Sequence, residues 1–285
     1  MILRKDIVVR DPFVFKEDDM YYLYASRHFK GDEYPCFVCF RSKDLENFEE
    51  PVVIFRGGNG FWGTKDYWAP ELHKYNGKYY LFASFKAENK ARATHILVSD
   101  RPDGVFTPIS ENPPTPSDWE SLDGTLFIEN GKPYMVFCHE WLQIDDGEIC
   151  AVELSSDLTH PVSEPVVLFR ASSLKWIRPI VDKNYNTKPN SYVTDGPFLF
   201  KRNGKLNMIW STYSENGYSV VLSKANSLFD KWIHDDTPLY SKNGGHGMVF
   251  EKDNSLKITF HYPNSPNGAE RMIIGDFDQL ERERI

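Results

Sequence analysis

One phrase recurs five times along the chain, and in four of the copies the residue that opens it is an acid or a histidine. The opening residues are Asp11, Ala69, Asp123, Asp195 and His246. Any one of these acids alone is ordinary turn chemistry, because Asp commonly precedes a strand in a turn. Three acids and one histidine at the same position of a repeat instead predict side chains that converge on one place.

Carboxylates that share such a place repel one another, and their pKa values are driven apart. One then stays ionised at neutral pH while another holds its proton. Glycoside hydrolysis needs this arrangement, because one acid protonates the leaving oxygen while the other activates water or attacks the anomeric carbon. The repeat therefore predicts acid–base chemistry in a shared pocket, with a third acid that tunes the other two.

Strands and tight turns must position these residues. After each opening residue come an apolar run of about five residues, a polar turn and an aromatic-rich run, and three of the turns contain Asn-Gly, a strong hairpin signal. Further strand candidates lie at 36–41, 94–99, 148–154, 218–223 and 271–277. The opening residues are 58, 54, 72 and 51 residues apart, as expected for one four-stranded sheet per repeat. We expect an all-β, five-bladed β-propeller that forms a single domain over residues 1–285, with Phe277–Glu283 as the best helix candidate.

Composition narrows the class of partner and the compartment. The net charge of −8 argues against binding to nucleic acid, which requires a basic face. No apolar run approaches the roughly 20 residues that span a bilayer, so we expect no membrane partner. The first residues lack an apolar leader segment, which predicts a cytoplasmic protein, or a periplasmic or secreted one if a leader has been removed. The oligomeric state is not predicted.

Four cysteines, at positions 36, 39, 138 and 150, also require an interpretation. Cys36 and Cys39 form a C-x-x-C string, but no second pair follows at the spacing of a zinc finger. Residues three apart on an extended strand face opposite sides of the sheet. We therefore interpret the cysteines as structural thiols in a reducing compartment.

At this point the chain resembles a known family. The blade-opening segments that carry the resemblance are Arg10-Asp11-Pro-Phe-Val-Phe, Tyr67-Trp68-Ala-Pro-Glu-Leu, Ser121-Leu-Asp123-Gly-Thr-Leu-Phe, Thr194-Asp195-Gly-Pro-Phe-Leu-Phe and Gly245-His246-Gly. Together, in this order, they are similar to the motifs of glycoside hydrolase family 43, five-bladed inverting enzymes. Its members are mostly α-L-arabinofuranosidases, β-xylosidases and arabinanases, with some β-galactosidases.

The resemblance implies a role for each opening residue. Asp11 would be the general base that acts on water, and Asp123 would raise the pKa of the acid and orient it. Asp195 would be the general acid. His246 would lie beneath the sugar, where a structural calcium or another cation is sometimes bound in the central channel. No cofactor would be required for the reaction.

The acid position departs from the family pattern. The family places Glu in a Glu-Gly-Pro or Glu-Ala-Pro motif, whereas this chain has Asp195, whose carboxyl reaches about 1–1.5 Å less far. Either Asp195 is still the acid with a shifted backbone or substrate, or the acid comes from elsewhere, or hydrolysis is lost. Glu140 is the best substitute, because the hairpin of the third repeat returns it to the neighbourhood of Asp123.

Other residues are candidates for contact with a sugar. Glu71 lies two residues after Ala69 and shares its facing, deeper in the channel. Sugars stack on indole rings, and Trp68 stands immediately before an opening residue, although packing between blades is the alternative for any tryptophan here. The remaining candidates for the pocket wall are Trp62, Trp141, His28 and Lys86, of which the last two occupy the position of Glu140 in their own repeats.

These observations predict a glycosidase that acts on a plant-type oligosaccharide or polysaccharide. Long segments before the repeats would narrow the pocket and favour removal of a terminal sugar, with α-L-arabinofuranose as the first choice, followed by β-xylose or β-galactose. Two alternatives stay open. A glycoside phosphorylase would need a basic cluster for phosphate, which the opening residues lack, and the Asp195 departure would also suit a non-catalytic carbohydrate-binding propeller.

Overall fold

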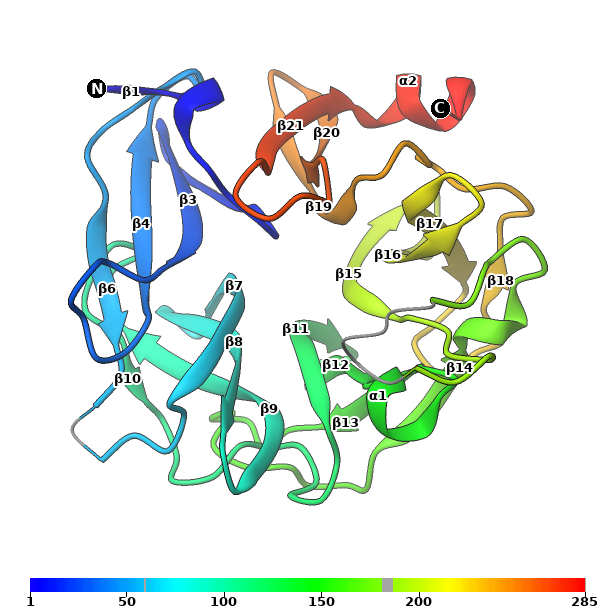
Figure 1. Cartoon of the computed structure of the whole chain (residues 1–285), viewed down its shortest axis with the longest axis horizontal. Helices are drawn as coiled ribbons and strands as arrows, with labels where there is room; N and C mark the ends of the chain where they lie inside the picture. The colour runs from blue at the N-terminus through cyan, green and yellow to red at the C-terminus, as the bar shows by residue number, and fades with distance from the viewer. Residues whose placement is uncertain (59, 181–186, 285) are drawn as a thin grey trace.

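Five β-sheets surround a central axis in the computed structural model of the chain (Figure 1). The structure describes residues 1–58, 60–180 and 187–284. Each sheet is antiparallel, and its first strand is the one that follows a blade-opening segment. The predicted fold, an all-β five-bladed β-propeller, is confirmed.

The strands follow the predicted repeats closely. Blade 1 contains β1 (Ile2–Leu3), β2 (Phe13–Glu17), β3 (Met20–Arg27), β4 (Cys36–Ser42), β5 (Asn47–Phe48) and β6 (Val52–Arg56). Blade 2 contains β7 (Lys65–Tyr75), β8 (Lys78–Ala87), β9 (Lys90–Ser99) and β10 (Thr107–Pro108). Blade 3 contains β11 (Ser121–Glu129), β12 (Lys132–His139), β13 (Glu148–Glu153) and β14 (Val166–Arg170). Blade 4 contains β15 (Asp195–Arg202), β16 (Lys205–Ser214), β17 (Gly217–Ala225) and β18 (Ile233–His234). Blade 5 contains β19 (Gly245–Lys252), β20 (Ser255–Tyr262) and β21 (Arg271–Asp276).

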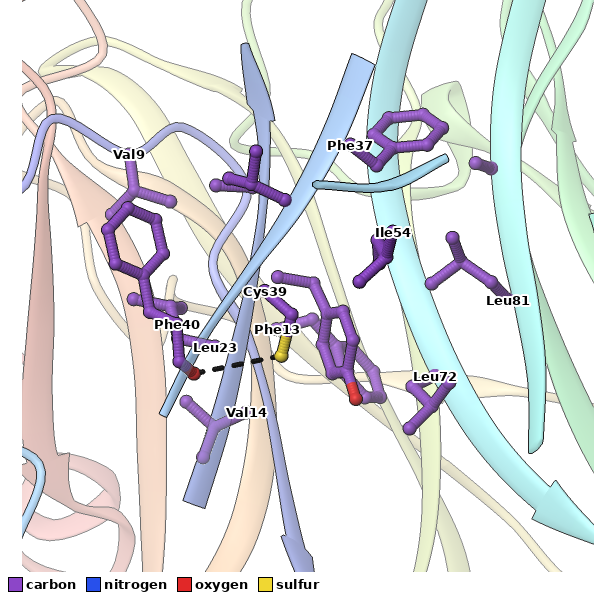
Figure 2. Close-up of a cluster of buried hydrophobic side chains, with 14 of the residues drawn as sticks. Val9, Phe13, Val14, Leu23, Phe37, Cys39, Phe40, Ile54, Leu72 and Leu81 are labelled. Carbon is purple, nitrogen blue, oxygen red and sulfur yellow. Dashed lines mark hydrogen bonds between the residues drawn. The ribbon is translucent and has the colours of Figure 1, made fainter. Parts of the chain in front are cut away.

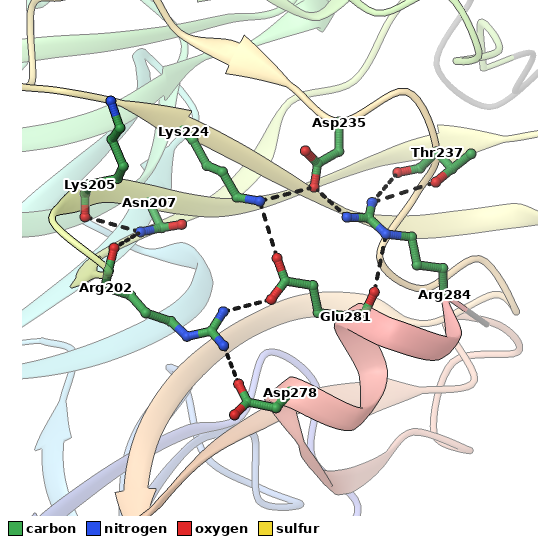
Figure 3. Close-up of polar contacts among 9 residues, drawn as sticks. All are labelled: Arg202, Lys205, Asn207, Lys224, Asp235, Thr237, Asp278, Glu281 and Arg284. Atoms are coloured by element: carbon green, nitrogen blue, oxygen red, sulfur yellow. Dashed lines mark hydrogen bonds and ion pairs between the residues drawn. The ribbon is translucent and has the colours of Figure 1, made fainter.

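Helical segments are few and short in the described part of the chain. They are α1 (Trp141–Ile144), α2 (Phe277–Glu283) and two 3₁₀ turns at Arg4–Asp6 and Ala171–Ser173. The helix α2 has the same bounds as the best helix candidate in the sequence, Phe277–Glu283. Ion pairs join α2 to blade 4, where Arg202 contacts Asp278 and lies 2.6 Å from Glu281 (Figure 3). None of the helices in the described ranges is long and apolar enough to cross a membrane.

The Asn-Gly turns explain why blades 2, 3 and 4 start with a tight hairpin. Asn76 and Gly77 have φ angles of 47° and 78°, and the other two Asn-Gly pairs repeat these values closely. Positive φ at both central residues gives a turn whose twist matches that of the strands. These turns fix the register between the first and second strands of blades 2, 3 and 4.

The core lies between neighbouring blades rather than within one sheet. Between blades 1 and 2, side chains from β2, β3, β4 and β6 pack against Leu72 of β7 and Leu81 of β8 (Figure 2). Cys36, Cys39, Cys138 and Cys150 are all buried and free, in keeping with their interpretation as structural thiols.

The ring closes through the segment that precedes β2. Val8 forms an antiparallel bridge with Arg271 at the start of β21, and the Val9 amide donates to the Glu270 carbonyl at 3.1 Å. Arg10 then forms an ion pair with Glu270 at 3.1 Å. The first blade and the last are thus joined immediately before Asp11.

Candidate active site

The inner strands of the five blades share one backbone distortion where they begin. Their residues with positive φ are Asp11 (52°), Ala69 (45°), Asp123 (55°), Gly196 (51°) and His246 (51°). In blades 2 to 5 a β-bulge accompanies this residue. A bulge re-aims the side chain next to it, and bulges are common beside active sites. Left-handed backbone is unfavourable for residues other than glycine, which marks these openings as specially constrained positions.

In the fourth repeat, the residue at the blade-opening position differs from the predicted one by one place in the sequence. Gly196, rather than Asp195, holds the position equivalent to Asp123. Asp195 pairs with Ser211, as Trp68 pairs with Ser84 in blade 2, so Asp195 corresponds to Trp68. Glycine is needed at 196 because a Cβ there would lie 2.7 Å from the His246 ring. Asp195 therefore reaches the centre from the residue before the bulge.

The structure nevertheless brings the predicted acids and histidine together. His246 Nδ1 lies 3.2 Å from Asp11 Oδ1 and 3.8 Å from Asp123 Oδ2. The Gly196 amide donates to Asp123 Oδ2 at 3.1 Å. Asp195 lies close enough that the charge of Asp123 perturbs its pKa. The imidazole of His246 thus separates Asp11 from Asp123.

Two further residues at this centre lie outside the repeated phrase. His261 Nδ1 lies 3.2 Å from Asp11 Oδ1, and Nε2 is hydrogen-bonded to Asn264 Oδ1 at 3.0 Å. The Tyr218 hydroxyl donates to Asp195 Oδ2 at 3.0 Å. They come from the second and third strands of their blades. We call the group of Asp11, Asp123, Asp195, Tyr218, His246 and His261 the central cluster.

The three carboxylates of the central cluster have different pKa values. Burial by itself raises the pKa of Asp11, but His246, His261 and Arg10 together hold it well below its ordinary range. Burial, and then the charge of Asp123, raise the pKa of Asp195 to about 7. Burial and the charge of Asp11 also raise the pKa of Asp123. Asp11 is therefore ionised at neutral pH, where Asp195, with a pKa of about 7, is roughly half protonated.

Glu140 belongs to a second group of charges, between blades 2 and 3. Arg92 Nη1 donates to Glu140 Oε2 at 2.5 Å and Arg92 Nη2 donates to Asp66 Oδ2 at 2.8 Å. The same guanidinium lies over the Trp68 ring, 4.1 Å from its centroid. Burial raises the pKa of Glu140, and the charge of Arg92 opposes this effect. We call Asp66, Trp68, Arg92 and Glu140 the paired cluster.

The paired cluster continues into one more ion pair. Lys86 Nζ donates to both carboxylate oxygens of Glu120, at 2.7 and 2.8 Å, and the Arg92 amide donates to Glu120 Oε2 at 2.8 Å. Lys86 is thus close enough to Glu140 for its charge to act on the Glu140 carboxylate. Trp68 is 37% exposed, so part of its ring faces solvent and can stack with a sugar.

The other candidates lie in three different settings. Glu71 is buried below Asp123, where its charge adds to the raised pKa of Asp123, and it lies 3.4 Å from His73. His28 is exposed and is hydrogen-bonded to the Asp32 carbonyl at 3.0 Å. Trp62 and Trp141 pack within the fold: Trp62 contacts Phe61, Phe85 and His95, and Trp141 is buried on α1.

The sequence led us to consider a cation beside His246. Within residues 1–58, 60–180 and 187–284, no group of three or more His, Cys, Asp or Glu side chains is arranged to hold a metal ion. Calcium takes six to eight oxygen ligands, and the Nδ1 atom of His246 instead faces Asp11 and Asp123. The proposed reaction does not depend on a cation.

The centre of this five-bladed propeller pairs a carboxylate of lowered pKa with one of raised pKa, which is the arrangement that glycoside hydrolysis requires. Residues 5–283 match the family model described as glycosyl hydrolases family 43, and the chain belongs to this family.

Named relatives are similar over most of the chain. A solved structure of an endo-arabinase from Bacteroides thetaiotaomicron VPI-5482 is 36% identical, covers 96% of both chains and superimposes with a TM-score of 0.87. An extracellular exo-α-(1→5)-L-arabinofuranosidase of Streptomyces chartreusis is 27% identical over 82% of this chain and 70% of its own length. An α-L-arabinofuranosidase of Humicola insolens is 24% identical over 82% of this chain, which spans 48% of that relative.

Proposed function

We propose that the chain hydrolyses arabinofuranosyl linkages with inversion at the anomeric carbon. The observation that carries the proposal is the contrast inside the central cluster: the pKa of Asp11 is lowered, whereas that of Asp195 is raised to about 7. Asp11 accepts a proton from the attacking water. Asp195 gives its proton to the leaving oxygen, and Asp123 keeps the pKa of Asp195 high.

Arabinan is the substrate class that the relatives favour. The names of the Streptomyces chartreusis and Bacteroides thetaiotaomicron proteins both refer to arabinose-containing substrates. We propose removal of a terminal α-L-arabinofuranose as the primary mode of action. Internal cleavage is the second candidate, and the 36% identity to an endo-arabinase favours it.

The contacts of the cationic side chains weigh against a phosphorylase. Such an enzyme needs cations that are available to inorganic phosphate. Arg92 is engaged with Glu140 and Asp66, and Lys86 is engaged with Glu120. Arg10 is engaged with Glu270 and Asn264. These pairings favour water, activated by Asp11, as the nucleophile.

Product analysis on linear α-1,5-arabino-oligosaccharides tests the proposal. We expect arabinose as the first product by ion-exchange chromatography, at a rate that phosphate does not change. Early release of shorter oligosaccharides would establish internal cleavage, and a phosphate-dependent rate would establish a phosphorylase. Proton NMR of the first product reports its anomeric configuration, and retention would contradict the assignment of Asp11 as base. Binding without turnover across arabinan, xylan and galactan substrates would favour the non-catalytic alternative.

A further inference from the structure

Tyr218 is the one described residue whose side chain is hydrogen-bonded to the carboxyl group of Asp195. It lies near the start of β17, it is 2% exposed, and its hydroxyl donates to Asp195 Oδ2 at 3.0 Å. Its position is outside every blade-opening segment. A tyrosine buried to this degree, with its hydroxyl aimed at a carboxylate, has a defined partner rather than a general packing role.

The ring of Tyr218 is held from several sides. His261 stacks on it with 5.7 Å between centroids and an interplanar angle of 18°, and Tyr213 packs at 5.3 Å. Gly245 leaves room for the ring, because a Cβ at position 245 would lie 2.6 Å from a Tyr218 ring carbon. The hydroxyl therefore stays at one place, with the imidazole that contacts Asp11 on one side.

The groups that face Asp195 come from four elements. Asp123 of β11 raises its pKa after burial, and Asp11, which precedes β2, adds to this effect. His246 of β19 and the Tyr218 hydroxyl of β17 act in the opposite direction. A donor strengthens its hydrogen bond when the acceptor becomes charged. The contact with Tyr218 is thus stronger once Asp195 has lost its proton.

We propose that Tyr218 is a positioning residue for the acid: it fixes Oδ2 of Asp195, so that Oδ1 carries the transferred proton. The inference rests on the proposed function. As the glycosidic C–O bond breaks, the Oδ1 proton passes to the leaving oxygen and the electron pair of the O–H bond stays on Asp195. The Tyr218 O–H donates to the carboxylate that this step creates, which lowers the barrier.

The test is Tyr218→Phe, which keeps the ring and removes the donor. The matched control is Tyr79→Phe, because Tyr79 is also buried and also donates to a carboxylate, that of Glu17 at 2.7 Å, away from the central cluster. For Tyr218→Phe we expect kcat on an arabino-oligosaccharide to fall about ten- to hundredfold, with KM nearly unchanged. On a nitrophenyl arabinofuranoside, whose leaving group needs little protonation, the loss should be smaller. The control should change neither value.

The pH profile separates positioning from a structural role. Without the donor the pKa of Asp195 rises, so the basic limb of kcat should move to higher pH in Tyr218→Phe and stay fixed in Tyr79→Phe. Equal losses on both substrates, or an unmoved basic limb, would overturn the inference while leaving the proposed function intact.

A second measurement does not depend on turnover. Carbon NMR of ¹³C-carboxyl-labelled aspartate, with Asp195→Asn to assign the signal, reports the titration of Asp195 directly. We expect its midpoint to move to higher pH in Tyr218→Phe, and an unchanged midpoint would refute the inference. If the wild-type chain cleaves nothing, the proposed function fails and the positioning role fails with it, and the titration then shows only whether the Tyr218 hydrogen bond acts on Asp195.

Discussion

The central cluster and the paired cluster both bury carboxylates, but they neutralise them in different ways. In the paired cluster one guanidinium, that of Arg92, lies 2.5 Å from Glu140 and 2.8 Å from Asp66. In the central cluster three carboxylates share two imidazoles, and Arg10 acts on Asp11 only through its charge, since its hydrogen bonds go to Asn264 and Glu270.

This difference indicates that one group of buried carboxylates stabilises the fold while the other is suited to proton transfer. A buried carboxylate with a hydrogen-bonded cation is compensated in place, and removal of either partner exposes the other to the cost of an unpaired charge. Carboxylates crowded without such cations hold a proton instead, and a held proton can be transferred. The paired cluster therefore has the character of a structural support, and the central cluster holds the groups to which we assign the proposed reaction.

The largest expected effect separates the two clusters by activity. Asp195→Asn should lower kcat on an arabino-oligosaccharide by roughly 10²- to 10⁴-fold, the range for loss of a general acid. Glu140→Gln should cost less than about tenfold, because we expect Glu140 to act through Arg92 and Trp68. Steady-state kinetics on the natural linkage and on a nitrophenyl glycoside measure both. A larger loss for Glu140→Gln, rescued by the activated leaving group, would make Glu140 the acid.

Stability should reverse the order of the two clusters. Arg92→Gln leaves Glu140 and Asp66 without their shared cation, and we expect a loss of about 3 kcal/mol in the free energy of unfolding. Urea denaturation measures it. Glu153→Gln, which affects an exposed ion pair with Lys132, is the control and should cost under about 1 kcal/mol. Equal losses in the two variants would remove the structural distinction of the paired cluster.

Asp195→Asn should stabilise the protein at alkaline pH. The pKa of Asp195 is about 7 in the folded chain, above the ordinary value of 3.8, so the folded state binds its proton more tightly than the unfolded state does. The stability that the wild type gains from this tighter proton binding is fully present below pH 4 and is lost as the pH rises through 7. At pH 8 the free energy of unfolding of the Asp195→Asn variant should exceed that of the wild type by about 2 to 4 kcal/mol. The same comparison at pH 4 should show little difference; a constant difference at both pH values contradicts the assignment.

The smallest effect is in the pH dependence of the wild-type enzyme. Activity requires protonated Asp195, so kcat should fall through a midpoint near pH 7 and drop about tenfold per further pH unit. The acidic limb should lie low, because the pKa of Asp11 is depressed. Glu140→Gln should leave the basic midpoint in place. A shift of that midpoint in Glu140→Gln would mean that the two clusters titrate together.

The fold was largely predictable because its signals are local. Asn-Gly turns and alternating strands specify each hairpin from a few neighbouring residues, and five copies specify the ring. The register of the fourth copy was not predictable in this way. Asp123-Gly124 and Asp195-Gly196 look alike in the sequence, and what distinguishes them is the contact of position 196 with His246 on the next blade.

The site was predictable only where the repeat delivers its residues. Asp11, Asp123 and His246 follow from their shared position. His261 and Tyr218 approach from second and third strands that carry no common phrase, and their partners are far away in the chain. In the sequence, Arg92 looks like an ordinary strand residue. Its salt-bridge partners, Glu140 and Asp66, come from two different blades. A weak signal existed at the ends of the second strands, where His261 occupies the place of Ser84 and Ser211.

The seam between the first and last blades has a consequence for biosynthesis. Asp11 precedes the first blade's inner strand and is synthesised before the rest of the propeller, whereas the two imidazoles that depress its pKa belong to the last blade. The bridge between Val8 and Arg271 also waits for that blade. A partly made chain thus carries Asp11 without the imidazoles of His246 and His261. We expect the central cluster to be complete only after the last blade has packed against the first.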